Sequence, residues 1–274
     1  MTTQSSQAIA FFGATGGTTA AALALTLKAG YHCTALARTP AKLTSLLTTT
    51  YALPDSLLTS NLTITPGSIA DADAIRTVLA PATHGPVSQI IFGIGGSPKL
   101  QYSLTAPVTL DNVHICETGT QAILDVLKSM LAEGVVKREQ RPRMMVISTT
   151  GVSPREDVPW SMRWMYHYTL SVPHADKKKM EEAVIKGCEG AEASLGGFTV
   201  VRPTLLTDGV EKGVGSVRVG WEYAGGQLTA DGKEEAPGPA VGYSVSRRDV
   251  GAWIAEEVVK GKGKWDGRCV SLTY

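Results

Sequence analysis

Three glycines, Gly13, Gly16 and Gly17, follow a short apolar run at residues 9–12 and precede an alanine-rich stretch at residues 18–28. Strand, tight turn and helix in this order form the start of a dinucleotide-binding fold, because glycines let backbone N–H groups approach a pyrophosphate at the positive end of a helix. A purely structural turn is the alternative, but the flanking patterns favour nucleotide binding. The turn predicts cofactor contacts at Gly13, Ala14, Thr15, Gly16, Gly17 and Thr18.

The second apolar run, residues 31–37, ends at Arg38. NAD-selective folds usually carry an acidic residue here, which binds the ribose 2′-hydroxyl, and no acidic residue occurs between Tyr31 and Leu43. A guanidinium at this position can pair with a 2′-phosphate, and Lys42 lies one helical turn further on. Two solvated charges at the start of a surface helix are the alternative. The position favours NADP(H) over NAD(H) as the cofactor.

Small and hydroxyl-bearing residues follow the later strand-like runs, where an open parallel sheet forms its ligand crevice. Glycines after the fourth run would form a cofactor floor, and hydroxyls after the fifth run would lie near the nicotinamide or the substrate. An equally good explanation is that the hydroxyls satisfy the backbone of a turn. These strand ends predict further cofactor contacts at Ser68, Ile69, Gly93, Ile94, Gly95, Ser148, Thr149, Thr150, Pro203 and Leu206.

A run of three lysines lies in a predicted helix at residues 174–184. On a helical wheel Met180 belongs to the buried seam, Lys177 and Asp176 flank that seam, and the other two lysines point away. Lys177 is therefore a candidate for both cofactor binding and catalysis. A salt bridge to Glu181, four residues on, is the alternative.

Aromatic residues cluster shortly before that helix, and Trp160, Trp164 and Tyr168 share one helical face. Such a cluster is typical of a packing lid, although it could also form the wall of an apolar substrate pocket. Tyr166, Tyr168 and His174 are the nearest candidates for a catalytic proton donor.

Strand-length apolar runs alternate with amphipathic helical patterns along the whole chain, which predicts an α/β fold. We expect a Rossmann architecture, a doubly wound parallel sheet with helices on both faces, in a single domain over residues 1–274 with a flexible tail at residues 1–7. Residues 160–172 and 207–245 would cover the substrate in a small C-terminal extension. Within it, residues 217–223 are expected to form a strand hairpin over the crevice.

Composition argues against several functional classes. Basic and acidic residues nearly balance, 26 against 25, so nothing indicates nucleic-acid binding. The four cysteines, Cys33, Cys116, Cys188 and Cys269, are scattered, which predicts buried thiols in a reducing compartment and no metal site. No apolar run is long enough to span a membrane, and the polar N-terminus is unlike a signal peptide. We expect a cytoplasmic protein with a small-molecule substrate, and both a monomer and a homodimer stay open.

Four motifs occur together in sequence order: Gly-Ala-Thr-Gly-Gly-Thr at residues 13–18, Ala37-Arg38, Ile-Ser-Thr-Thr-Gly at residues 147–151, and Val-Arg-Pro-Thr-Leu-Leu at residues 201–206. With them the chain resembles the atypical short-chain dehydrogenase/reductase superfamily, in particular its NmrA-like and biliverdin/flavin-reductase-like NAD(P)-binding branches. The resemblance implies hydride transfer between NADP(H) and a small organic substrate.

The chain departs from that superfamily at two places. Thr19 stands where the glycine motif usually ends in a third glycine, and the catalytic Tyr-x-x-x-Lys is missing, since no lysine stands four residues beyond Tyr166 or Tyr168. In ordinary members the tyrosine donates a proton to a carbonyl while the lysine lowers its pKa and holds the nicotinamide ribose. Lys177 could replace that lysine. The alternatives are an NADP(H)-sensing regulatory protein without turnover, and a non-redox isomerase or cyclase on the same scaffold.

Overall fold

A central sheet of eight strands organises the chain, and the computed structural model describes residues 7–96, 98–100 and 108–274. Its strands are β1 (Ile9–Phe12), β2 (Cys33–Ala37), β3 (Leu62–Pro66), β4 (Gln89–Phe92), β7 (Arg143–Ile147), β8 (Gly197–Pro203), β10 (Arg218–Tyr223) and β12 (Arg268–Thr273). Their order across the sheet is β3-β2-β1-β4-β7-β8-β12-β10. All pairs are parallel except that of β12 with the edge strand β10.

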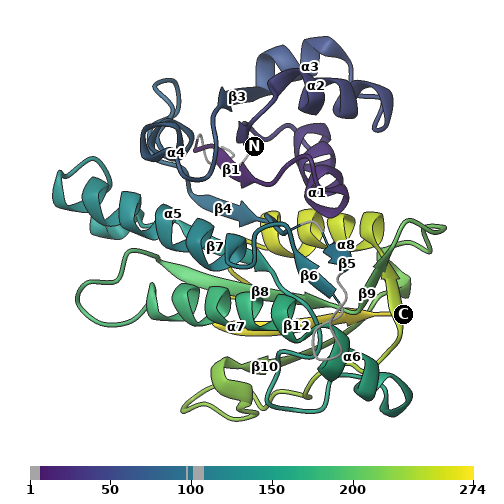
Figure 1. Cartoon of the computed structure of the whole chain (residues 1–274). Helices are drawn as coiled ribbons and strands as arrows, with labels where there is room; N and C mark the ends of the chain where they lie inside the picture. The colour runs from purple at the N-terminus through teal and green to yellow at the C-terminus, as the bar shows by residue number, and fades with distance from the viewer. Residues whose placement is uncertain (1–6, 97, 101–107) are drawn as a thin grey trace.

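Helices cover both faces of this sheet (Figure 1). One face carries α1 (Gly17–Lys28), α2 (Pro40–Thr49), α3 (Asp55–Asn61), α8 (Arg247–Trp253) and the π-helix at Ile254–Val259, which continues α8. The other face carries α4 (Ala72–Leu79), α5 (Ile115–Ala132) and α7 (Ser171–Lys186). The predicted doubly wound α/β fold is therefore confirmed.

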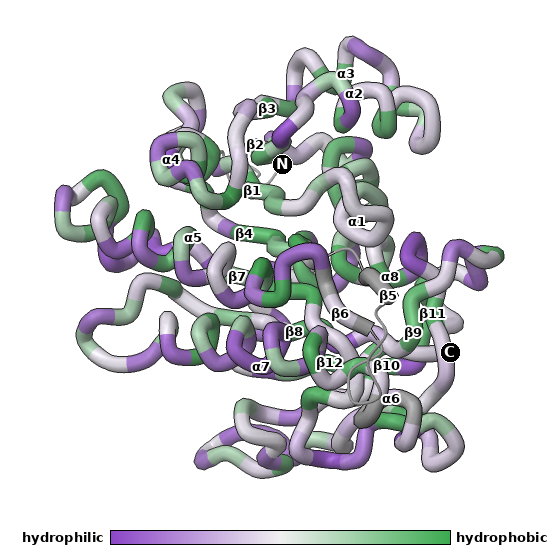
Figure 2. Tube along the Cα trace, in the orientation of Figure 1, coloured by the Kyte–Doolittle hydropathy of each residue, from purple (hydrophilic) through white to green (hydrophobic). Residues whose placement is uncertain are grey.

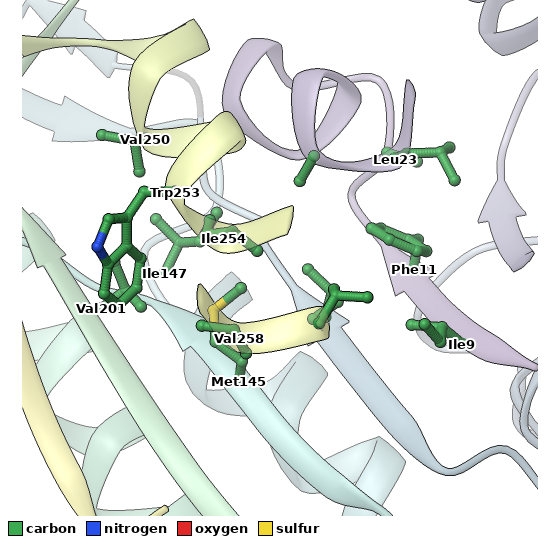
Figure 3. Packing of buried hydrophobic residues seen from close by; sticks show 14 of the residues in the cluster. Ile9, Phe11, Leu23, Met145, Ile147, Val201, Val250, Trp253, Ile254 and Val258 are labelled. Carbon is green, nitrogen blue, oxygen red and sulfur yellow. The ribbon is translucent and has the colours of Figure 1, made fainter. Parts of the chain in front are cut away.

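The inner strands are buried on both faces, as parallel strands between two helical layers must be. Along β1, Ile9 and Phe11 join one core cluster while Phe12 joins the cluster on the opposite face, because successive side chains of a strand alternate. Figure 2 shows hydrophobic segments on these central strands and hydrophilic ones along α7. In the close view of Figure 3, Trp253 of α8 belongs to the same packed cluster as Val201 of the sheet.

The expected hairpin at residues 217–223 over the crevice is wrong. These residues do form a strand, β10, but it pairs antiparallel with β12 and extends the main sheet at its edge. Trp221 and Glu222 of this strand are buried, so the strand packs against the rest of the protein and does not stand over an open crevice. Two smaller sheets lie outside the main one and pair β5 (Pro98–Leu100) with β6 (Val108–Leu110), and β9 (Leu205–Thr207) with β11 (Ser244–Ser246).

The predicted aromatic lid also needs correction. Trp160 and Trp164 are 84% and 73% exposed, so they do not form the packed face that their spacing suggested. Trp164 and Tyr166 belong to the short helix α6 (Arg163–Thr169), and Tyr166 is buried. The helix is short, so its spacing does not produce a continuous seam.

All four cysteines are free thiols, and Cys33, Cys116 and Cys269 are buried while Cys188 is half-buried. Burial raises the pKa of the Cys188 and Cys269 thiols to about 12, which makes both poor nucleophiles at neutral pH. Across the described parts of the chain, no helix is both long enough and apolar enough to cross a membrane.

The missing third glycine of the phosphate-binding turn is accommodated by a glycine on the neighbouring strand end. Thr19 is buried, and a Cβ atom at Gly93 would lie 2.0 Å from its hydroxyl oxygen. The Thr19 side chain thus occupies a position where the motif normally has no side chain. The room for it exists because Gly93, after β4, has no side chain either. A larger residue at Gly93 should therefore be tolerated only when the residue at position 19 is made smaller.

Replacing Gly93 with alanine is expected to lower the free energy of unfolding by about 1–3 kcal/mol, because the added methyl group overlaps Thr19. The double variant Gly93→Ala/Thr19→Ala should recover most of that loss. Gly95→Ala is the matched control, since a Cβ atom there meets nothing within 4 Å. Denaturant unfolding of these three variants and of Thr19→Ala measures the coupling, and additive losses in the double variant would contradict the proposed overlap.

Candidate functional site

The glycine-rich turn and the glycine-rich end of β4 meet at the ends of the adjacent strands β1 and β4, where the strand order reverses. Gly13 has a φ of +82°, and a Cβ atom on it would lie 2.7 Å from the carbonyl carbon of Gly93, so glycine is required there. The Gly16 N–H donates to the Gly13 carbonyl oxygen at 2.9 Å and closes the turn. Open parallel sheets bind ligands at such switch points.

A cavity of about 480 Å³ lies at this switch point, a size that suits a small-molecule site. It brings together predicted cofactor residues from four strand ends, namely Gly13, Thr15, Gly16, Arg38, Ser68, Ile69, Gly93, Ile94 and Gly95. Arg38 is exposed and follows the buried strand β2, so its guanidinium is free to face a ligand. Residues that are far apart in the sequence thus meet at one cavity.

Sequence reasoning missed the other residues that line this cavity, which are Leu36, Ala37, Gly67, Ala70, Gly96, Asp111, Asn112 and Ile115. Leu36 and Ala37 directly precede Arg38, so applying the strand-end rule one or two residues earlier would have found them. Asp111 and Asn112 belong to a segment without regular periodicity, and nothing in the sequence pointed to them.

Some predicted cofactor residues do not line the cavity. Ala14 is buried beneath the turn, and Lys42 is exposed on α2, one turn beyond Arg38. Pro203 is buried at the end of β8, and Leu206 packs against the core. Contact between these residues and a cofactor stays a prediction.

The first turn of α1 fits the phosphate end of a dinucleotide. Gly17 begins the helix, no side chain caps it, and no acidic residue stands in its first turn, so its first N–H groups and positive dipole end are available to an anion. The buried hydroxyl oxygens of Thr18 and Ser148 have no hydrogen-bond partner among the described residues. Because buried polar atoms are normally satisfied, such orphans fit a site that a ligand completes.

Lys177 lies between the ends of two central strands. Its Nζ donates to the carbonyl oxygen of Ile147 at 2.7 Å and lies 3.4 Å from that of Ile94, which lines the cavity. The helical-wheel prediction for α7 is confirmed, since Met180 is buried and the two lysines that follow Lys177 are exposed. The alternative salt bridge from Lys177 to Glu181 is wrong, because Glu181 pairs with an arginine of β8.

Asp176, which also flanks the buried seam of α7, has a structural role. Its carboxylate accepts hydrogen bonds from the backbone N–H groups of Cys116 at 3.0 Å and Glu117 at 2.8 Å. These N–H groups belong to the first turn of α5, where an anionic partner also complements the helix dipole. Asp176 thus ties α7 to α5 and helps to fix the position of its neighbour Lys177.

The proton-donor candidates take different positions. Tyr166 is buried, its hydroxyl bonds with the Thr150 side chain and the Leu205 backbone, and burial raises its pKa. His174 precedes Lys177 by one helical turn, and its ring centroid lies 5.8 Å from that of Tyr166. Tyr168 lies on α6, and its side chain is outside the described set.

The loop after β7 is shaped around these rings. Thr149 is half-buried on it, and Gly151 has a φ of +87°. A Cβ atom at Gly151 would lie 2.7 Å from the His174 imidazole, so the glycine lets the ring approach the backbone. The Gly151 N–H donates to both carboxylate oxygens of Asp157, at 2.9 and 3.0 Å.

A buried charged network beside this loop was not predicted from the sequence. The Arg202 guanidinium on β8 donates to Glu181 of α7 at 2.6 and 3.0 Å and to Glu222 of β10 at 2.5 Å. Ser153 donates to the same Glu222 oxygen at 2.7 Å. The network locks α7, β8 and β10 together beneath the candidate site. Arg202 stood in a strand pattern between apolar residues, which gave no sign of its two acidic partners.

Burial raises the pKa of Asp157 to about 6, with the nearby Arg202 opposing and Glu222 reinforcing the shift. Below about pH 4 the carboxyl is protonated in both the folded and the unfolded protein, and it costs nothing. Between about pH 4 and 6 the unfolded chain ionises this carboxyl while the folded protein keeps it protonated, so stability falls over this range by about 3 kcal/mol from this group, and above about pH 6 it changes no further.

Replacing Asp157 with asparagine should therefore reduce the loss of stability between pH 4.5 and 7, while one amide oxygen still accepts from Gly151. Melting temperatures across this range measure the effect. The exposed Asp125→Asn variant is the control and should follow the unaltered protein. An Asp157→Asn profile parallel to that of the unaltered protein would show that Asp157 titrates normally.

Comparisons with known proteins agree with this geometry. The sequence profile of the NAD(P)H-binding family matches residues 13–260. The chain is 42% identical over 278 residues to reductase pytE of Aspergillus terreus, covering 97% of each chain. It is 39% identical over 292 residues to oxidase pynE of Aspergillus niger, covering 97% of this chain and 98% of that one. Among solved structures it is similar to ChuY, an anaerobillin reductase from Escherichia coli, with a TM-score of 0.58, 16% identity, and coverage of 97% and 96%, which shows the shared fold.

Proposed function

Since the chain belongs to the NAD(P)H-binding family, we propose that it is an NADP(H)-dependent oxidoreductase that transfers a hydride between NADP(H) and a small organic substrate. The resemblance drawn from its motifs is confirmed for the NAD(P)H-binding family, and a solved reductase shows the shared fold. The observation that carries the proposal is the cavity at the switch point, which joins the glycine-rich turn to Arg38 and to the end of β4. The relatives named as a reductase and an oxidase support redox chemistry.

The choice of NADP(H) rests on Arg38. It lines the cavity directly after β2, where a ribose 2′-phosphate would lie, and its planar guanidinium suits two parallel hydrogen bonds to phosphate oxygens. Glycines at the turn and after β4 leave room for the backbone to approach the cofactor closely. The orphaned hydroxyls of Thr18 and Ser148 would be satisfied by the same ligand.

NADP(H) supplies the hydride chemistry when bound, and the protein supplies position and a proton. Lys177 would orient the ribose on the nicotinamide side from its place between Ile147 and Ile94. His174, one turn earlier on the same helix, is our choice of proton donor. The Tyr166 hydroxyl, which is bonded to Thr150 and Leu205, is the second candidate.

The activity is tested by mixing the protein with NADPH and a panel of quinones, flavins and carbonyl compounds, and following the loss of absorbance at the NADPH band. We expect consumption with at least one class. His174→Asn should then slow turnover about 100-fold, the usual contribution of a positioned general acid, whereas Tyr166→Phe should retain most activity. If Tyr166→Phe abolishes turnover and His174→Asn does not, the assignment of the donor is wrong.

A second function, cofactor sensing without turnover, is favoured by one observation. No tyrosine precedes Lys177 by four residues, since Pro173 stands there. NADPH that binds tightly but is not consumed with any member of the panel would support sensing and count against the oxidoreductase. The free, scattered thiols are consistent with a reducing, cytoplasmic location for either function.

A further inference from the structure

A basic residue from the C-terminal part of the chain reaches the phosphate-binding turn. Arg247 is the first residue of α8, and α8 packs closely on α1, since a Cβ atom at Gly251 would lie 2.7 Å from the Thr18 carbonyl oxygen. One turn earlier, the Arg247 Cδ lies 2.9 Å from where a Gly17 Cβ would stand. The arginine stem thus lies directly over the first residue of α1.

The position of this cation is electrostatically unfavourable without an anion. Arg247 stands at the N-terminus of α8, where the helix dipole disfavours positive charge. Its partner is Asp208, with Nη1 and Oδ1 3.0 Å apart, but the Asp208 side chain is 85% exposed and that of Arg247 34% exposed. Exposed pairs of this kind contribute little, so Asp208 is easily exchanged for a stronger anion.

The cavity itself leaves the pyrophosphate under-compensated. Arg38 is the basic side chain among the residues that line it, and it lies at the ribose end, after β2. A pyrophosphate at the first turn of α1 carries two further negative charges. The N–H groups and dipole of α1 offset part of this charge, and a guanidinium beside Gly17 would offset the rest.

We propose that Arg247 binds the pyrophosphate of the dinucleotide, exchanging Asp208 for a phosphate oxygen. This inference rests on the proposed function only as far as cofactor binding. The neighbouring Arg248 is directed elsewhere: its guanidinium pairs with Glu211 at 2.8 Å and lies over the Tyr51 ring, whereas the three atoms nearest a Gly17 Cβ all belong to Arg247. Cofactor binding would then tie α8 to α1 across the switch point.

Calorimetric titration of the intact protein with NADPH, NADH and adenosine 2′-monophosphate tests the proposal. Arg247→Ala should weaken NADPH and NADH by the same factor, about tenfold or more, since both carry the pyrophosphate. Adenosine 2′-monophosphate, which lacks it, should bind unchanged. Arg248→Ala, the matched control, should leave all three affinities within about twofold of the unaltered protein.

Asp208→Asn separates phosphate binding from a structural role and removes only an exposed side chain. If Arg247 binds phosphate, this variant keeps or gains NADPH affinity. Three results would overturn the proposal: Arg247→Ala binding NADPH as before, Arg247→Ala weakening NADPH alone, or Asp208→Asn weakening NADPH as much as Arg247→Ala. Failure of the unaltered protein to bind either dinucleotide would instead overturn the proposed function.

Discussion

Replacing Arg38 with glutamate is expected to lower the affinity for NADPH about 100-fold and to change the affinity for NADH no more than about threefold. Arg38 lines the cavity after β2, and the substitution removes a charge-assisted hydrogen bond to the 2′-phosphate and replaces it with repulsion. A carboxylate at this place can also accept a hydrogen bond from the 2′-hydroxyl of NADH. Calorimetry with both nucleotides measures the ratio.

Lys128→Glu is the control for Arg38→Glu because Lys128 is exposed on α5 and does not line the cavity. It introduces the same change of charge away from the cavity. We expect a much smaller loss of NADPH affinity for this variant. Equal losses for NADPH and NADH in Arg38→Glu would show that Arg38 does not recognise the 2′-phosphate.

Replacing Arg202 with methionine is expected to destabilise the protein by about 3–5 kcal/mol, because Glu181 and Glu222 would remain buried without their cation. For a chain of this size such a loss lowers the melting temperature by on the order of 10 °C. Thermal unfolding monitored by circular dichroism measures the shift. Since the network holds α7, the variant should also weaken any activity that depends on Lys177.

The triple variant Arg202→Met/Glu181→Gln/Glu222→Gln distinguishes a charge effect from lost packing. Neutral side chains should restore much of the stability, because the cost in Arg202→Met is that of unpaired buried charge. Arg76→Met, which removes an exposed ion pair with Glu133, should change the melting temperature little. A triple variant as unstable as Arg202→Met would show that the arginine acts mainly by filling space.

The fold and the cofactor end of the site followed from local sequence patterns because each depends on short-range physics. The turn at Gly13 must adopt positive φ between a strand and a helix. The strand ends of a parallel sheet must meet along one edge, so the sequence alone predicted that Arg38 and Gly93 lie at the same site. Lys177 was separated from its neighbouring lysines by helical periodicity alone.

The remainder depends on contacts between distant segments, which no local pattern encodes. Glu181 suited Lys177 by spacing but pairs with Arg202, because β8 presents that guanidinium to α7. Residues 217–223 had a strand pattern, but the pattern did not show that they would pair with the edge of β12 and extend the sheet. Likewise, Arg247 reaches Gly17 only because α8 crosses α1.

Titrating the unaltered protein with NADPH and with NADH tests the central claim most directly. We expect one site per chain, with NADPH bound at least about tenfold more tightly than NADH, since a 2′-phosphate paired with Arg38 adds a charge-assisted hydrogen bond. Binding of neither nucleotide, or tighter binding of NADH, would contradict it.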